Sequence, residues 1–316
     1  MADRVHHNSN LIYSVGTQVV TLRNITAEGG RVLHPRGAVG VVVRAPGDLS
    51  HAYRVRFLDG VEELIGRDDL MMLAAFKEGE IGDAQITAQR HDLFSRVIYR
   101  CVIGSRAYGL DDAASDTDYR GVYLPPADLH WSLYGVPDQL DREETQEQYW
   151  ELQRFLVLAL KANPNVLECL YTPLVEQITP LGEELLAMRS SFLSRMVFQT
   201  YNGYVASQFK KMQSDIKHQG QVKWKHVMHL IRLLISGIGV LRHGLVPVRV
   251  EAERDRLLAV RRGEVPWEET EQWRLSLHRE FEQALQQTAL PERPDYERAN
   301  ALLIKARRAA LHEELP

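Results

Sequence analysis

The feature that most constrains the fold of this chain is an apolar strand that ends in glycine and serine, followed about ten residues later by two aspartates. Residues 100–103 form a short apolar run that stops at Gly104. Residues 117–124 form a second apolar run, which two prolines end. The segment 97–124 therefore predicts a strand, a glycine-bounded turn, a short helix or loop, and a second strand.

The turn at Gly104 and Ser105 is suited to binding an anion. A strand that turns directly into a helix exposes backbone N–H groups at the helix start, where negative charge is stabilised. Glycine lets a phosphate approach the backbone closely, and the serine hydroxyl adds a hydrogen-bond donor. Ser105 could also serve as an N-cap, which uses the same geometry. We expect Gly104 and Ser105 to bind phosphates, and Arg106 to point either toward these phosphates or into solvent.

The two aspartates predict a metal site. Asp116 and Asp118 are two residues apart on the second predicted strand, so both side chains should project from one face. Two carboxylates on one face repel each other unless a cation lies between them. Hard oxygen ligands suit Mg²⁺ (or Mn²⁺), which usually keeps substrate phosphates and waters as further ligands. A pair of such ions about 3.5–4 Å apart can stabilise both the attacking and the leaving oxygen in nucleotidyl transfer.

A longer pattern around these residues resembles a known family. The chain reads Gly-Ser-Arg-Ala-Tyr-Gly from Gly104 and Ser-Asp-Thr-Asp-Tyr-Arg-Gly-Val-Tyr-Leu-Pro-Pro from Ser115. Gly-Ser followed by Asp-x-Asp resembles the DNA polymerase β-type nucleotidyltransferases. The finer pattern resembles the RNA-ligase-associated predicted nucleotidyltransferases, the RlaP family, over about residues 97–245. The similarity continues through three further segments: 149–155, 160–171 and 223–226.

The resemblance implies an α+β fold: a nucleotidyltransferase-type mixed sheet flanked by helices, with a helical second domain. It also implies an enzyme that moves a nucleoside monophosphate from an NTP to an acceptor hydroxyl, by a two-metal mechanism, with release of pyrophosphate. The family's association with RNA ligases implies an RNA acceptor, in RNA repair or modification, and a possible RNA ligase association.

The superfamily expects a third carboxylate on a following strand, and this sequence does not place it cleanly. The segment 141–149 offers four acids: Asp141, Glu143, Glu144 and Glu147. We predict that Glu147 is the third metal ligand, with Glu144 as the next choice. This residue could also accept the proton of the acceptor hydroxyl. If none of the four reaches the metal, the fold could be a non-catalytic nucleotide or RNA binder.

A basic stretch follows in the helical part of the chain. Residues 205–232 carry six Lys or Arg against one acid, in a chain whose net charge is negative. Lys225, His229 and Arg232 recur at four- and three-residue steps, which predicts one helical face. We expect this face, together with Lys211, to neutralise the nucleotide phosphates. The alternative is a solvated basic helix.

Three regions are predicted along the chain. Residues 1–80 contain short strands separated by turn signals, including an Asp59-Gly60 hairpin, and resemble a small SH3-like β-barrel. Residues 88–178 form the predicted nucleotidyltransferase core. Residues 179–316 are predicted to be helical, beginning at Thr179-Pro180, a pair typical of an N-cap followed by proline at the first helical position.

The composition is that of a soluble globular protein, and it argues against a strongly basic nucleic-acid-binding protein and a disulfide-stabilised scaffold. Of the 316 residues, 45% are hydrophobic and 25% are charged, as in ordinary soluble globular proteins. The net charge of −4 gives no global attraction to nucleic acid, so such a contact needs a local patch. Two cysteines, Cys101 and Cys169, do not make a disulfide framework; we expect buried free thiols.

No targeting or membrane segment is predicted. The first ten residues are polar, unlike a secretory signal. The longest apolar run, 227–241, contains His229 and Arg232, so it predicts a buried helix and not a membrane span. We therefore expect a cytoplasmic protein without a membrane partner. A third functional class also stays open, namely an antitoxin-type nucleotidyltransferase that modifies a protein.

Overall fold

We describe the protein from a computed structural model. The described residues are 12–27, 29–46, 51–80, 84–112, 115–219 and 222–311. The side chains of residues 78–80, 86, 208 and 210–219 lie outside the description. The chain divides into two compact units, a small unit of Met1–Thr87 with Ser132–Gly135 and a large unit of Ala88–Trp131 with Val136–Pro316.

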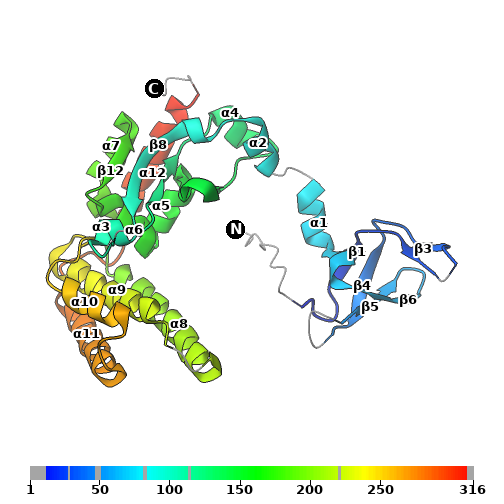
Figure 1. The fold of residues 1–316 in the computed structure, drawn as a ribbon. Helices are drawn as coiled ribbons and strands as arrows, with labels where there is room; N and C mark the ends of the chain where they lie inside the picture. Colours follow the sequence, from blue (N-terminus) through cyan, green and yellow to red (C-terminus); the bar gives the residue numbers. More distant parts are fainter. Residues whose placement is uncertain are drawn as a thin grey trace. The chain divides into compact units, whose positions relative to one another are not determined.

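The small unit is built on a five-stranded antiparallel sheet in the order β6-β5-β4-β1-β7, with a two-stranded ribbon of β2 and β3 (Figure 1). Strand β5 shows why this sequence forms a sheet with one buried face: Tyr53, Val55 and Phe57 are buried, and Arg54 and Arg56 are exposed. The strands are β1 (Gln18–Thr21), β2 (Ile25–Thr26), β3 (Val32–His34), β4 (Val39–Arg44), β5 (Tyr53–Phe57), β6 (Glu62–Ile65) and β7 (Leu70–Met72).

The hairpin predicted at Asp59-Gly60 is confirmed, since β5 and β6 pair around it and Gly60 has a φ of 85°. The described ladder ends at β6 on one side and at β7 on the other, and no pairing between these two strands occurs among the described residues. The closed barrel therefore stays a prediction. Two helices, α1 (Leu73–Glu80) and α2 (Ala84–Arg90), follow the sheet.

The large unit contains a mixed five-stranded sheet in the order β10-β11-β9-β8-β12. Strands β11 and β9 are parallel, and the other neighbours are antiparallel. The mixed α+β class is therefore confirmed. The strands are β8 (Val97–Ile103), β9 (Asp118–Tyr123), β10 (Gln139–Arg142), β11 (Glu147–Glu151) and β12 (Val175–Ile178).

Strands β8 and β9, the two strands predicted within residues 97–124, are neighbouring interior strands of this sheet. All residues of β8 except Arg100 are buried, which fits a central strand rich in Val and Ile. Gly121 of β9 lies so close to β8 that an added Cβ would come within 1.9 Å of the Tyr99 carbonyl oxygen. Glycine at this position therefore permits the close approach of the two central strands.

Helices pack around the sheet and continue into the C-terminal half (Figure 1). The predicted cap at Thr179 is confirmed, because its hydroxyl accepts from the Gly182 N–H at the start of α7. Gly244 ends α9 in the left-handed conformation that glycine adopts readily, a helix end that a glycine at this place in the sequence favours. The helices are α3 (Ser105–Tyr108), α4 (Ala127–Trp131), α5 (Leu152–Leu160), α6 (Pro164–Tyr171), α7 (Pro180–Ala187), α8 (Met196–Gln219), α9 (Trp224–His243), α10 (Arg254–Arg262), α11 (Trp267–Gln287) and α12 (Tyr296–Ala309).

One sequence-based expectation is wrong. The helical pattern that the sequence suggests from Tyr149 onward begins three residues later, at Leu152, because residues 147–151 form strand β11. Helix α10 lies within the region predicted to be helical, and only Leu257 and Val260 of its residues are buried. Residues 179–316 belong to the same compact unit as the sheet. A domain boundary between residues 178 and 179 stays a prediction.

Helix α9 is the one described helix long and apolar enough to cross a membrane, by length and composition alone. In its most apolar window, 67% of the residues are buried inside the protein. It packs against α8, α10 and α11, as the core helix of a folded unit does. Cys101 and Cys169 are buried free thiols, as expected.

Candidate active site

The Gly-Ser turn and the second aspartate form one site. Gly104 ends β8 with a φ of 75° and a ψ of −156°, a conformation available to glycine and strained for other residues. Helix α3 begins at the next residue, Ser105. A Cβ added to Gly104 would lie 2.5 Å from Oδ2 of Asp118, so this carboxylate covers the glycine backbone directly. The pairing of Ile103 with Asp118 in the β8–β9 ladder produces this contact.

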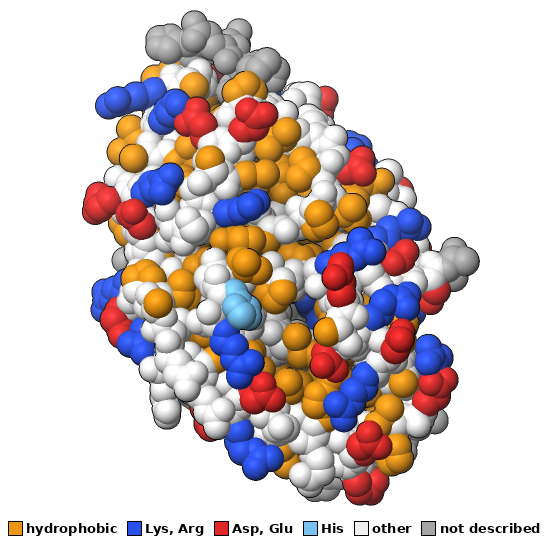
Figure 2. All heavy atoms as spheres, turned by 90° about the vertical axis from the view of Figure 1, so that its left-hand side faces the viewer, with side chains coloured by type: hydrophobic (Ala, Val, Ile, Leu, Met, Phe, Trp, Pro, Cys, Tyr) orange, Lys and Arg blue, Asp and Glu red, His pale blue; other side chains and the backbone are white. Residues whose placement is uncertain are grey.

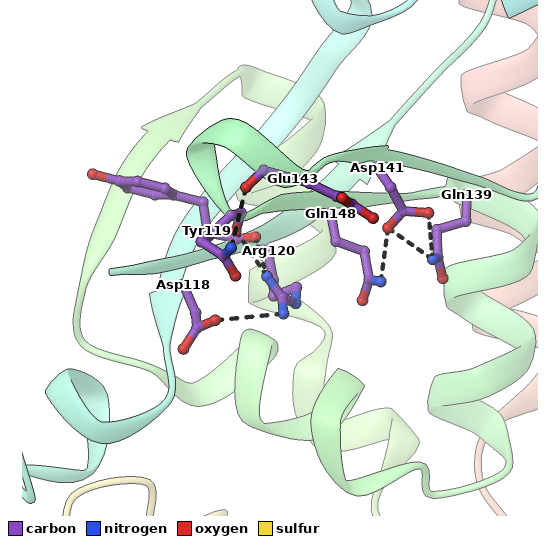
Figure 3. Close-up of polar contacts among 8 residues, drawn as sticks. Asp118, Tyr119, Arg120, Gln139, Asp141, Glu143 and Gln148 are labelled. Atoms are coloured by element: carbon purple, nitrogen blue, oxygen red, sulfur yellow. Dashed lines mark hydrogen bonds and ion pairs between the residues drawn. The ribbon is translucent and has the colours of Figure 1, made fainter. Parts of the chain in front are cut away.

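Asp118 faces one arginine and keeps part of its surface exposed (Figure 3). Its Oδ1 lies 3.7 Å from Nη2 of Arg120, an ion pair too long for a hydrogen bond. The other guanidinium nitrogen, Nη1, donates to the carbonyl oxygens of Tyr119 and Gln146. The Asp118 side chain is 33% exposed. Arg120 therefore balances the charge of Asp118 without occupying its oxygens.

Asp116 is held differently from the way its spacing suggests. Strand β9 begins at Asp118, so Asp116 lies in the preceding loop with an exposed side chain. The alternation that predicted one shared face therefore does not apply to this pair. Arg106 fixes this loop, because its guanidinium donates to the carbonyl oxygens of Ser115 (2.9 Å) and Asp116 (3.4 Å). Arg106 thus contacts the backbone of the aspartate loop.

Glu147 lies on the opposite face of the sheet from Asp118. It pairs in register with Tyr119 of the parallel neighbour β9, and successive residues of a strand face opposite ways. Its carboxylate, 8% exposed, is 3.1 Å from Arg100 and 3.4 Å from Arg142. The choice of Glu147 as third metal ligand therefore needs correction, since the sheet separates it from Asp118 and two arginines neutralise it.

Of the four candidate acids, Asp141 shares the Asp118 face. Its partner in β11 is Gln148, which in turn pairs with Arg120. Asp141 accepts hydrogen bonds from Gln148 and Gln139, as Figure 3 shows. Two strand spacings of about 4.8 Å separate β10 from β9, so Asp141 does not reach the same ion as Asp118 in this arrangement. The remaining two acids, Glu143 and Glu144, are exposed in a short turn before β11.

No group of three or more His, Cys, Asp or Glu side chains that could hold a metal ion occurs among the described residues. The donor set of Asp116 and Asp118 still fits Mg²⁺. This ion is usually bound by one or two carboxylates and completes its octahedron with substrate phosphates and water. The two aspartates would therefore need the substrate to complete a metal site.

Helix α9 brings part of the basic stretch to the body of the large unit. Lys225 is exposed, and the side chain of Lys211 on α8 lies outside the described part. Burial, together with the nearby charges of Arg232 and Lys225, lowers the pKa of His229 to about 4. The neutral imidazole is therefore favoured at pH 7, so His229 adds no positive charge of its own to this helix, and its role in phosphate binding stays a prediction.

A buried network connects α3, α6 and α9, and the sequence did not indicate it. Glu168 is fully buried; its Oε1 accepts from Arg232 at 2.7 Å and its Oε2 from the Tyr108 hydroxyl at 2.5 Å. The Arg232 guanidinium also stacks on the Tyr108 ring, 3.6 Å from its centre. Arg232 is therefore committed to Glu168 and does not project into solvent with Lys225. The usable signal was Glu168, an acid inside an otherwise apolar helical segment.

The face drawn in Figure 2 does not carry one dominant charge. Among its described residues, Lys and Arg side chains lie beside Asp and Glu side chains, with hydrophobic and uncharged areas between them. A mixed surface of this kind gives little long-range attraction to a polyanion. Any recognition of nucleic acid on this face therefore has to rest on local contacts.

The sequence is similar to one protein family and to one further known protein. A model of the family described as "RlaP: RNA repair pathway DNA polymerase beta family" matches residues 80–305. The "Uncharacterized protein YcgL" of Bacillus subtilis (strain 168) is 26% identical over 157 residues, which make up 48% of this chain. The match covers 59% of that relative's own length. No solved structure matches the chain.

Proposed function

Because this chain belongs to the RlaP family, a DNA polymerase β-type nucleotidyltransferase family of an RNA repair pathway, we propose that it transfers a nucleoside monophosphate from an NTP to a hydroxyl of RNA. Pyrophosphate is the second product. The family match covers the whole candidate site and most of the large unit. The RNA acceptor is the part of the proposal that rests on the family description alone.

The observation that carries the proposal is the contact between Gly104 and Asp118. It brings a carboxylate directly against the turn where Ser105 starts α3. A phosphate held by the backbone N–H groups and hydroxyl of this turn would lie beside that carboxylate. The adjacency of the Gly-Ser turn and the Asp118 carboxylate therefore supports a phosphate site beside a metal ligand.

Each residue of the candidate site has a separate role in the proposed reaction. Gly104 and Ser105 would bind the phosphates, and Asp116 and Asp118 would hold Mg²⁺ or Mn²⁺. When bound, the ion would stabilise the charge on the transferring phosphoryl group as a Lewis acid. Arg106 would keep the loop that carries Asp116 in place through its two carbonyl contacts. Lys225, exposed on α9, would add positive charge near the phosphates.

The proposed reaction makes one bond and breaks one bond. The acceptor hydroxyl oxygen attacks the α-phosphorus, the bond between this phosphorus and its bridging oxygen to the β-phosphate breaks, and pyrophosphate leaves with that electron pair. The acceptor proton passes to solvent or to a nearby carboxylate. Holding both reactants in line supplies much of the catalysis in reactions of this type.

Pyrophosphate release tests the proposal. We expect the wild type to release pyrophosphate from at least one of the four NTPs, with Mg²⁺ or Mn²⁺ and total RNA. Asp116→Asn and Asp118→Asn should each reduce release by at least about 100-fold, because the metal would lose a ligand. Glu176→Gln, an exposed carboxylate change on the edge strand β12, serves as the matched control and should retain full release.

Unchanged release in both aspartate variants would refute the assignment of the metal ligands. Label transfer to RNA, followed by gel electrophoresis, separates an RNA acceptor from a protein acceptor. A labelled protein band with unlabelled RNA would move the acceptor to a protein.

A second function is favoured by one observation, the lack of a three-acid metal cluster among the described residues. A nucleotide- or RNA-binding module would need the Gly104 turn but no third carboxylate. It would bind NTP tightly and release no pyrophosphate with any acceptor. Calorimetric binding combined with the release assay therefore distinguishes the two functions.

A further inference from the structure

A pocket of about 350 Å³ lies within the large unit, between α3, α6, α8 and α9. Its size is at the lower end of the range typical of small-ligand sites. Aromatic, basic and amide side chains line it beside apolar ones: Tyr108, Asn165, Tyr204, His229, Arg232 and Leu233. The phosphate and metal functions proposed above leave this pocket without a role.

We propose that this pocket binds the nucleobase of the NTP, with the base stacked against Tyr204 and its edge facing Arg232. This inference rests on the proposed function for its choice of ligand and deepens it. It replaces the phosphate-binding role expected of His229 with a role in recognising the base.

The flat groups of the pocket suit a base. The Tyr204 side chain lines the pocket, with 38% of the residue exposed, and its hydroxyl accepts from the Asn163 amide at 3.2 Å. The Arg232 side chain is only 7% exposed, and its guanidinium lies over the Tyr108 ring, 3.6 Å from the ring centre. Aromatic rings are groups on which proteins stack unpaired bases. Tyr204 therefore offers a ring for stacking, and Arg232 offers a restrained planar donor beside it.

One buried polar group of the pocket has no partner. Nε of Arg232 makes no hydrogen bond within the described part of the chain, although the group is buried. A buried donor without an acceptor is unfavourable, so a ligand that supplies an acceptor would bind with a gain. Ring nitrogens and exocyclic oxygens of nucleobases are such acceptors. The charge of Arg232 is already balanced by Glu168, so this donor does not call for an anion.

Two further polar side chains of the pocket, His229 and Asn165, can form hydrogen bonds with the edge of an uncharged ligand. Neutral His229 offers one donor and one acceptor, and Asn165 offers both through its amide. The Asn165 side chain is exposed at the start of α6, where the Asn163 cap holds the backbone of this turn. Donors and acceptors side by side match the edge of a base better than the uniformly accepting oxygens of a phosphate.

The pocket is within reach of the phosphate turn. Tyr108, which lines it, is three residues after Ser105 on the same short helix. At 1.5 Å per residue this separation is about 4.5 Å along the helix. A nucleotide with its phosphates at Ser105 could therefore extend along α3 and place its base in the pocket.

Calorimetric titration with the four NTPs and with inorganic tripolyphosphate, each with Mg²⁺, tests this assignment. We expect at least one NTP to bind the wild type more tightly than tripolyphosphate does. Tyr204→Ala should weaken that NTP by about 5- to 150-fold, the range for loss of one base stacking partner, and leave tripolyphosphate unchanged. Tyr204→Phe keeps the ring and should bind both ligands as the wild type does.

Asn165→Ala gives a second, independent variant, because its exposed side chain can be removed without opening the core. It should change the ratio of affinities among the four NTPs. Equal binding of NTP by the wild type, Tyr204→Ala and Asn165→Ala would overturn the base pocket and leave the transferase proposal intact. NTP binding that depends on Tyr204, combined with no pyrophosphate release, would support the pocket and refute the transferase. No binding of any NTP to the wild type would overturn both.

Discussion

Gly104 can be tested by adding a single methyl group. Gly104→Ala places a Cβ against the Asp118 carboxylate and forces a residue with a side chain to adopt a φ of 75° with a ψ of −156°. We expect a loss of about 1–3 kcal/mol in the free energy of unfolding, from backbone strain, and a loss of pyrophosphate release from displacement of Asp118. Chemical denaturation and the release assay measure the two effects.

Gly109→Ala is the matched control at the other end of α3. Gly109 has a similar φ of 70°, but its ψ of 24° lies in the left-handed region, and an added Cβ would meet its nearest atom, in Arg249, at 3.6 Å. This variant should be less destabilised and should keep its activity. Equal effects of the two substitutions would show that Asp118 does not depend on the bare glycine.

Glu147→Gln separates a structural role from a catalytic one. The buried carboxylate neutralises Arg100 and Arg142, so its loss should lower the free energy of unfolding by about 2 kcal/mol, less than for a fully buried pair because both arginines reach solvent. Pyrophosphate release per folded molecule should stay within about twofold of the wild type, since Glu147 faces away from Asp118. A variant with wild-type stability and no release would return Glu147 to the metal site.

The low pKa of His229 makes stability depend on pH. In the unfolded chain this side chain takes up a proton near the ordinary histidine pKa of 6.5, and in the folded protein it does so only at about 4. Folding is therefore unaffected by this group above pH 6.5 and is increasingly penalised as the pH falls from 6.5 toward 4, by about 2 kcal/mol at pH 5. Urea denaturation at pH 7 and pH 5 should show a smaller difference for His229→Gln than for the wild type. An identical difference would contradict the buried, neutral state.

At the scale of elements, the sequence predicted turns, caps and helix ends reliably, but it did not predict which strands pair with each other. The Asp59-Gly60 hairpin, the Thr179 cap and the Gly244 helix end were predictable because each depends on a few adjacent residues. The Gly-Ser turn between β8 and β9 was predictable for the same reason. This turn positions Gly104 and Ser105, and strand β9 after it begins at Asp118.

The third acid was not predictable, because the face of Glu147 depends on which strand β11 joins. A periodic run of apolar residues continued from Tyr149 across the junction into α5 and masked the strand. Once β11 pairs in parallel with β9, its register decides the face of every side chain. The buried Glu168–Arg232 pair was hidden similarly, since its two members are 64 residues apart in the chain.

Helix α12 is tied to the sheet by one buried ion pair. Arg307 donates to Glu151 at 2.6 Å, and the side chains are 11% and 5% exposed. Glu151 also caps α5, and burial raises its pKa. Arg307→Ala should therefore lower the free energy of unfolding by about 3–5 kcal/mol, because the carboxylate stays buried without its partner. Thermal and chemical denaturation would measure this loss.

Lys305→Ala on the same helix is the control. Lys305 pairs with Glu184, also at 2.6 Å, but these side chains are 62% and 46% exposed. Exposed pairs of this kind contribute at most about 1 kcal/mol. Similar losses in the two variants would mean that burial does not distinguish the pairs.

At the scale of the whole molecule, the two units have separate hydrophobic cores. The core of the small unit is formed by residues between Tyr13 and Met72, and both clusters of the large unit use residues from Ala88 onward. We expect a chain that starts at residue 88 to fold cooperatively by itself, since the apolar clusters described for the large unit contain no residue before Ala88. Differential scanning calorimetry should show one transition for this fragment. A fragment without a transition would show that the small unit is needed for folding.

Because residues Ser132–Gly135 belong to the small unit, that unit is encoded by two separate pieces of the gene. These four residues lie inside the segment that matches the family and yet belong to the small unit, where the Thr87 hydroxyl donates to the Gly135 carbonyl at 2.8 Å. Recombination that replaces residues 1–87 as a block would leave these four residues beside a segment from another parent, although they fit the original residues 1–87. A chimera between relatives should therefore carry both pieces from the same parent, although 44 residues of the large unit separate them in the gene.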